Sequence, residues 1–137
     1  MGEVRAQVTL TNVIDEELMH QEQFNPQQVR TYEANALVNM GAVWTLLPID
    51  VVRHLGLRIR GQRVAEYAGA RREIVDVTGP VAVKVYGRET AEEALVLGDE
   101  ILIGRTVLEK LDLHVDSANR RLIPNPAHPD QVVTKVN

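Results

Sequence analysis

Apolar and polar residues alternate with a period of two in several short runs of this sequence. The runs at 4–10 and 81–85 show the pattern most clearly, with valine, alanine or leucine at every second position. This spacing is typical of β-strands that bury one face. Because the other apolar runs are short and end at glycine, proline or asparagine, the sequence predicts an all-β, mainly antiparallel fold.

One or two short helices are expected to interrupt the strands. Pro48 precedes an apolar run that ends at Gly56, and proline and glycine favour the two ends of a helix. Thr106 and Glu109 have the spacing of a capping box, which predicts a second helix. Residues 12–28 lack a regular period and contain an Asn-Pro step, so we expect a long loop there.

The later part of the chain is expected to fold as hairpins. Residues 64–67 and 72–77 flank a tip of small residues, and residues 113–115 and 122–123 flank a polar turn. Beyond Pro124, prolines and polar residues predict a loosely held tail.

A weak internal repeat relates the two predicted helices. Residues 55–59 and 111–115 share a helix-end-to-strand pattern at an offset of 56 residues. An apolar strand that ends at glycine, Gly41 or Gly104, lies upstream of each helix. The pattern favours two copies of strand, glycine turn, helix and strand, with chance similarity of short aliphatic runs as the alternative.

Length and composition exclude several classes of protein. The 137 residues suit one domain, and the absence of cysteine excludes disulfides, thiolate zinc sites and a cysteine nucleophile. A net charge of −4 and only 4% aromatic residues argue against a nucleic-acid partner. No apolar run approaches the roughly 20 residues that span a bilayer, and the N-terminus does not resemble a secretion signal. We therefore expect a cytoplasmic protein with no membrane partner.

The side chains that commonly bind metals or attack substrates are scattered along the sequence. The histidines have no metal-ligand spacing. They are His20, His54, His114 and His128. The only serine, Ser117, lies in a predicted surface turn without the context of a nucleophile. No metal or other cofactor is expected, and the arginines at 58, 60 and 63 are interpreted as a solvated strand face.

Residues 36–48 resemble the active-site segment of the retropepsin-like aspartic peptidases. In that family an apolar strand leads into Asp-Thr/Ser-Gly-Ala, two variable residues, a Thr or Ser, and further apolar residues. The corresponding active-site loop here consists of Asn39, Met40, Gly41, Ala42 and Thr45.

Two further segments resemble the same family in the same order along the chain. Leu102, Ile103 and Gly104 match its apolar-apolar-Gly segment before a short helix. The hairpin tip stands where the family has a substrate-covering flap, and it consists of Tyr67, Ala68, Gly69, Ala70 and Arg71. The resemblance implies one retropepsin-like domain over residues 1–126, folded as a closed acid-protease barrel, and a flexible C-terminal tail at 127–137.

The resemblance fails at the residues that would carry the chemistry. Enzymes of this family hydrolyse peptide bonds with a water held between two aspartates, one from each chain of a homodimer. Asn39 stands at the aspartate position, and an amide is not a base. Met40 replaces a Thr or Ser whose hydroxyl fixes the loops across the dimer, and Gly69-Ala70 replaces an Asp-Gly flap turn. We therefore expect an inactive or nearly inactive chain, either a natural pseudoenzyme or a deliberately inactivated protein.

Three functions stay open from the sequence. The family function is endopeptidase hydrolysis of an extended peptide or protein, bound between flap and cleft floor in a homodimer. The alternative is a non-catalytic peptide-binding or dimerisation module that kept the cleft and lost the chemistry. A third is a structural β domain whose partner binds the segment 12–28.

Overall fold

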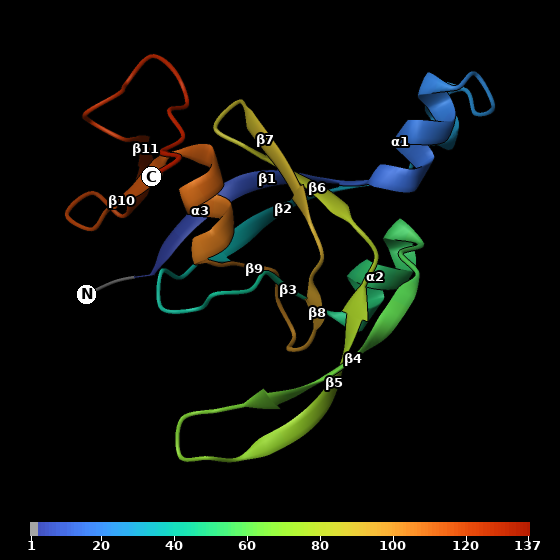
Figure 1. Ribbon diagram of the computed structural model, residues 1–137, viewed down its shortest axis with the longest axis horizontal. Helices are drawn as coiled ribbons and strands as arrows, with labels where there is room; N and C mark the ends of the chain where they lie inside the picture. The colour runs from blue at the N-terminus through green and yellow to red at the C-terminus, as the bar shows by residue number, and fades with distance from the viewer. Residues whose placement is uncertain (1–2) are drawn as a thin grey trace.

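Figure 1 shows the computed structural model, which describes residues 3–137. In this range, nine strands form one curled sheet in the order β4-β5-β8-β3-β9-β2-β1-β6-β7, and β10 pairs with β11 apart from it. The strands are β1 (Val4–Asn12), β2 (Thr31–Val38), β3 (Leu46–Leu47), β4 (Ile59–Glu66), β5 (Arg72–Thr78), β6 (Val81–Val85), β7 (Arg88–Glu92), β8 (Leu95–Val96), β9 (Leu102–Ile103), β10 (Leu113–Asp116) and β11 (Arg121–Pro124). The helices are α1 (Val13–His20), α2 (Ile49–Leu55), α3 (Arg105–Leu111) and a 3-10 helix, η1 (Pro26–Gln28).

The alternation expected for the first strand is confirmed by its burial. Val4, Val8 and Leu10 on β1 are buried, whereas the residues between them are more exposed. β1 pairs antiparallel with both β2 and β6, so it lies inside the sheet rather than at an edge. The apolar faces of α2 and α3 pack into the same core as this strand. Burying each such side chain contributes roughly 1.5–3 kcal/mol, so this shared core holds the two helices against the sheet.

The sheet is a curled half-barrel. Its strand order begins at β4 and ends at β7, and no ladder joins these two strands within residues 3–137. The expected closed barrel is therefore not confirmed. Both expected hairpins are present, since β4 pairs antiparallel with β5 and β10 pairs antiparallel with β11.

The segment 12–28 is not a simple loop, so that prediction is wrong. Its first part is α1, which projects from the body of the molecule (Figure 1). The side chain of Asn12 accepts a hydrogen bond from the backbone N–H of Asp15 at 3.1 Å and caps the helix. No apolar residue of α1 is buried, so no core-facing period marked the helix in the sequence, although the cap and the acidic first turn were readable signals. No helix in the described range is long and apolar enough to cross a membrane.

Both helices expected from the sequence are present, but the predicted capping box of the second is wrong. α3 begins at Arg105 with Gly104 in the N-cap position, and no side chain caps it. Thr106 lies inside the first turn, and its hydroxyl donates to the carbonyl of Val43 at 2.9 Å. The hydroxyl therefore connects the helix to the loop after β2 instead of capping the helix.

The structure supports the internal repeat and corrects its alignment. β3 with α2 and β9 with α3 have the same lengths and lie 56 residues apart. Gly56 and Asp112 end the two helices with the same left-handed backbone, at φ of 63° and 56°. The residue equivalent to Gly104 is Pro48, which precedes α2, so the expected match between Gly104 and Gly41 is wrong.

Asp112 also joins the C-terminal segment to the end of α3. Its carboxylate accepts hydrogen bonds from the Asn125 side chain at 2.9 Å and from the backbone N–H of Val133 at 3.1 Å. Nδ1 of His128 lies 2.5 Å from the same carboxylate. These groups, Asn125 first, lower the pKa of Asp112 to about 2. The segment 127–137, expected as a tail, is thus in contact with α3 at two points.

Candidate functional site

The loop between β2 and β3 rests on the start of α3. The backbone N–H of Asn39 donates to the carbonyl of Ile103 at 3.0 Å, and the N–H of Arg105 donates to the carbonyl of Ala42 at 2.7 Å. β2 also runs parallel to β9, with Val38 opposite Ile103. The structure therefore brings together the two segments that the resemblance singled out, residues 39–45 and 102–104.

Gly104 is where this loop comes closest to the second half of the chain. A Cβ atom at this position would lie 2.6 Å from the carbonyl oxygen of Trp44 and 2.9 Å from that of Ala42. Both neighbours are backbone atoms, which cannot rotate away as a side chain would. Only glycine allows the loop to cross at this distance.

Asn39 is exposed at the start of the loop. Its side-chain oxygen accepts a hydrogen bond from the backbone N–H of Gly41 at 2.8 Å, and its carbonyl accepts from the N–H of Ala42 at 3.2 Å. These two bonds form the tight turn that asparagine and aspartate both favour. An aspartate at this position would have an oxygen available for the same bond. The carboxamide of Asn39 is neutral and does not take up a proton near neutral pH, so it cannot act as a base.

The loop that begins at Asn39 exposes apolar side chains at the surface. Met40 is 42% exposed and Val43 is 43% exposed. Trp44 is partly buried against a small cluster that includes Val75 and Leu95. The guanidinium of Arg63, on β4, lies 5.1 Å from the centre of the Trp44 ring. The loop therefore presents an apolar tip to solvent while its end is packed against the hairpin strands.

A carboxylate that the sequence did not identify supports the loop from inside. Thr45 is fully buried, and its hydroxyl lies 3.3 Å from the carboxylate of Glu92 on β7. The hydroxyl oxygen of Thr106 lies 2.9 Å from the same oxygen, and Lys110 pairs with the other oxygen at 3.3 Å. Glu92 lies 47 positions from Thr45 in a polar strand, so no local spacing relates them. Only the folded topology shows that Glu92 belongs to this site.

The tip between β4 and β5 is a tight turn with left-handed backbone. Gly69 and Ala70 have φ of 89° and 66°, and the N–H of Tyr67 donates to the carbonyl of Arg71 at 2.8 Å. The Arg71 guanidinium lies 4.4 Å from the centre of the Tyr67 ring. The hydroxyl of Tyr67 donates to the carboxylate of Glu73, which raises the pKa of Tyr67.

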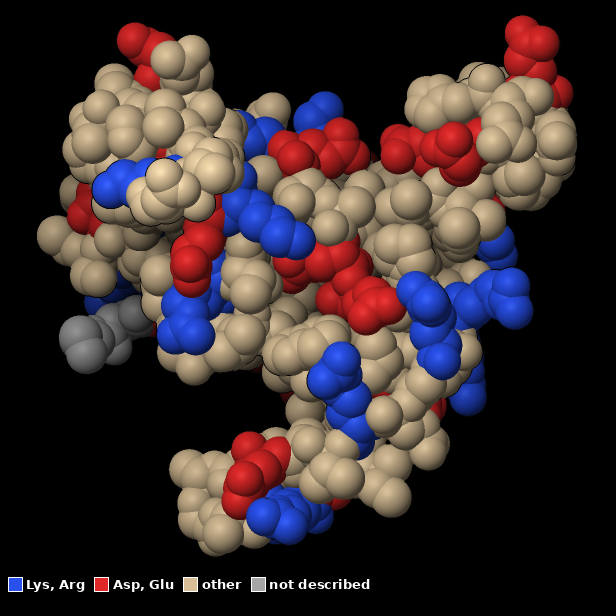
Figure 2. Space-filling model, viewed as in Figure 1, with Lys and Arg blue, Asp and Glu red and all other residues tan. Residues whose placement is uncertain are grey.

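The hairpin arm, which consists of β4 and β5, stands away from the body of the molecule (Figure 1). An open space separates the two (Figures 1 and 2). Val64 and Ile74 are opposite each other in the ladder and are 63% and 67% exposed. No hydrogen bond joins the tip residues 67–71 to the loop 39–45 in the described part of the chain. The structure thus places the tip apart from the loop and leaves apolar residues of the arm uncovered.

The described residues, 3–137, contain no group of three or more histidine, aspartate or glutamate side chains that could hold a metal ion. The site consists instead of backbone turns, apolar side chains and the Glu92 network.

The fold of the chain resembles that of a solved protein structure. No protein-family model and no curated protein matches the chain. The crystal structure of the retroviral protease-like domain of Ddi1 from Leishmania major is similar, with a TM-score of 0.56 and 15% identity, over 92% of this chain and 90% of that one. The solution structure of simian foamy virus (mac) protease has a TM-score of 0.46 and 17% identity, over 78% of this chain and 91% of that one. From the first of these likenesses, the chain has a mostly β fold similar to that of a retroviral protease-like domain.

Proposed function

We propose that two copies of this chain form a homodimer whose shared cleft binds an extended polypeptide and does not hydrolyse it. The arrangement of the loop 39–45, the segment 102–104 and the hairpin arm supports the binding part of this proposal. The residue at position 39 supports the loss of hydrolysis. The chain is in this account a pseudopeptidase rather than a working aspartic endopeptidase.

The single observation that carries the proposal is the turn made by Asn39. Its carboxamide accepts a hydrogen bond from the N–H of Gly41. The resemblance of residues 36–48 to the retropepsin-like segment aligns Asn39 with the catalytic aspartate. Aspartic peptidases need two carboxyl groups that share one proton, so that one accepts a proton from water while the other donates to the peptide carbonyl. Two facing carboxamides would keep the turn and bind a water, but they would not take its proton.

The proposal of a homodimer follows from the composition of one chain. At the offset of 56 residues, the second half has Leu95 at the position equivalent to Asn39, so each chain supplies one site of this kind. Met40 and Val43 extend from that site into solvent. A partner loop across a two-fold axis would cover both side chains and complete a symmetric pair of sites.

The hairpin arm favours an extended peptide as the ligand. β4 is the first strand in the sheet order, so one of its edges has free backbone groups in the described part of the chain. A peptide in extended conformation pairs with such an edge through main-chain hydrogen bonds, and pockets for alternate side chains then give selectivity. The exposed pair of Val64 and Ile74 offers apolar contacts to those side chains.

Restoring the lost carboxylate tests the proposal. Asn39→Asp should give weak cleavage of an unfolded protein at mildly acidic pH, and Asn39→Asp with Met40→Thr should give more. Met40 offers only a weak thioether acceptor, whereas threonine restores a hydroxyl beside the pair of acids. A misplacement of about 1 Å can cost a hundredfold in rate, so the second change is expected to matter.

Asn35→Asp is the matched control, because Asn35 is also exposed and lies on the strand that leads to the loop. It should give no cleavage. Cleavage by the unaltered chain would contradict the proposed loss of hydrolysis. A double variant that is folded and dimeric but inactive from pH 3 to 7 would contradict the placement of Asn39 at a catalytic position and leave peptide binding as the function.

A further inference from the structure

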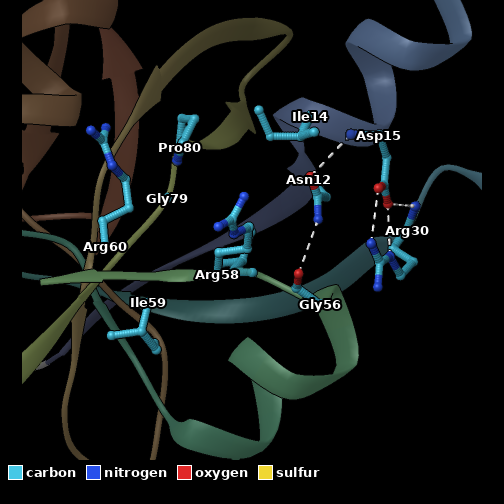
Figure 3. Close-up of a pocket in the computed structure, with 11 residues that line it drawn as sticks. Asn12, Ile14, Asp15, Arg30, Gly56, Arg58, Ile59, Arg60, Gly79 and Pro80 are labelled. Atoms are coloured by element: carbon cyan, nitrogen blue, oxygen red, sulfur yellow. Dashed lines mark hydrogen bonds and ion pairs between the residues drawn. The ribbon is translucent and has the colours of Figure 1, made fainter.

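A second recess lies away from the loop 39–45, where the start of α1, the end of α2 and the turn between β5 and β6 meet (Figure 3). It has a volume of about 570 Å³, within the usual range of small-ligand sites. One wall is formed by Asn12 and Ile14, and the opposite wall by Gly79 and Pro80. None of its residues belongs to the loop or the hairpin tip.

Asp15 and Arg30, which both line the recess, form an ion pair with each other. Arg30 donates to both carboxylate oxygens of Asp15, from Nε at 2.8 Å and from Nη2 at 2.9 Å. The Arg30 pairing lowers the pKa of the buried Asp15 carboxyl, which therefore stays ionised. This bidentate pair is neutral overall and fixes one end of the recess.

The side chain of Asn12 is also hydrogen-bonded within the chain, which fixes the wall of the recess beside it. Its side-chain N–H group donates to the carbonyl of Leu55 at 2.9 Å, and its oxygen accepts from the N–H of Asp15. Asn12 is only 3% exposed. The wall of the recess is therefore rigid before any ligand arrives, which lowers the entropy lost on binding.

Two arginines supply positive charge that the recess does not balance. Arg58 and Arg60 point to the same side of the chain, whereas Ile59 points to the other side (Figure 3). Arg58 extends between Pro80 and Asn12, and Arg60 lies beside Gly79 (Figure 3). Among residues 3–137, the Arg58 guanidinium makes no hydrogen bond or ion pair, and Arg60 pairs with Glu93 at 3.0 Å at an exposed position. Exposed pairs of this kind are weak, so a ligand can share Arg60 while Arg58 is free for it.

The apolar residues beside these charges limit the class of ligand. Ile14 is 52% exposed although it lines the recess, and Pro80 faces it from the opposite wall. One unbalanced guanidinium matches a single negative charge, and its planar fork matches a carboxylate. We propose that this recess binds a small amphipathic carboxylate, with the carboxylate on Arg58 and Arg60 and the apolar part between Ile14 and Pro80.

Titration of the full chain with hexanoate, followed by two-dimensional amide NMR, tests this site. Shifts should concentrate at the recess, at Gly56, Gly79 and the residues beside them, with a Kd of about 1 mM for a ligand of this size. Acetate has the same charge and almost no apolar part, so it should bind at least about tenfold more weakly. No shift at these residues up to 20 mM hexanoate, about 20 times the expected Kd, would overturn the proposal.

Charge variants separate the recess from general attraction of anions. Arg58→Gln should weaken hexanoate binding about tenfold, since it removes a charge-assisted hydrogen bond. Arg53→Gln removes the same charge from an exposed residue of α2 outside the recess and should leave binding unchanged. Equal losses in the two variants, or inorganic phosphate binding as tightly as hexanoate, would overturn the assignment.

The carboxylate has two natural sources, a small acid and the C-terminus of a peptide. Titration with acetyl-Leu-Leu as the free acid distinguishes them. Binding tighter than that of hexanoate would assign the recess to a peptide end, and weaker binding would assign it to a small acid. Both results keep the ligand class, and loss of the Arg58 dependence in both titrations would contradict it.

Discussion

The two halves of the chain contain the same short strand and helix, but different segments pack against the ends of the two helices. Before α2 the repeat has Pro48, and before α3 it has Gly104, over which the loop 39–45 crosses. After α2 it has Gly56, beside which the Arg30 guanidinium lies, and after α3 it has Asp112, which holds the C-terminal segment. The two copies share element lengths and helix-end backbone, whereas the residues at the helix ends differ according to what packs against them.

The largest effect on stability is expected from a substitution at Gly104. Gly104→Ala places a Cβ atom 2.6 Å from a backbone oxygen of the loop, so the loop or α3 must move. Overpacking of this kind typically costs 1–3 kcal/mol, and we expect a loss of about 3 kcal/mol in the free energy of unfolding. Urea denaturation measures it. Gly61→Ala is the control, since a Cβ there meets nothing within 4 Å, and a similar loss in both variants would contradict the account.

The equivalent helix end in the first half should be less sensitive. A Cβ at Gly56 would lie 1.8 Å from Nη1 of Arg30, a flexible side chain that can move aside. The left-handed backbone adds a cost of about 1–2 kcal/mol for alanine, so Gly56→Ala should lose about 2 kcal/mol. In a double-mutant cycle, Arg30→Ala should remove part of the Gly56→Ala cost, and strict additivity would show that the two residues do not interact.

The helix end at Asp112 should make stability depend on pH. Its folded pKa of about 2 lies below the ordinary value of about 3.9, so the ionised carboxylate stabilises the fold above about pH 4. This contribution is lost as the pH falls from about 4 through about 2. Asp112→Asn should reduce the slope of stability against pH in that window, with an effect smaller than that of either glycine substitution. An unchanged slope would show that the C-terminal contacts do not stabilise the fold.

The parts of the fold that the sequence predicted are those set by local pattern. β1 and β6 follow from alternation, and the hairpin arm follows from the small residues at its tip. α2 follows from Pro48 and Gly56 at its two ends. α1 was missed because none of its apolar side chains is buried, so it has no core-facing period to detect. The capping box at Thr106 was wrong because the same spacing of residues served a tertiary contact with Val43.

Some residues of the candidate site could likewise be predicted from local motifs, whereas others are revealed only by the tertiary structure. The positions of Asn39 and Gly104 follow from their motif context, because each lies at a turn that the motif defines. Glu92 could not be predicted, because its partners Thr45 and Thr106 reach it only through the sheet order. The arginines at 58, 60 and 63 are exposed, as the interpretation of a solvated strand face predicts. The sequence did not show that the start of α1 forms one wall of a recess beside Arg58 and Arg60.

The central claim is that two chains meet across the loop 39–45, and sedimentation velocity tests it most directly. The account predicts a dimer of twice the 15.3 kDa chain mass at micromolar concentration. Val43→Glu should give a folded monomer, because it places two like charges at the two-fold axis. Ile14→Glu, on α1, should stay dimeric. A monomer of the unaltered chain up to high micromolar concentration, or a dimer insensitive to Val43→Glu, would contradict the claim.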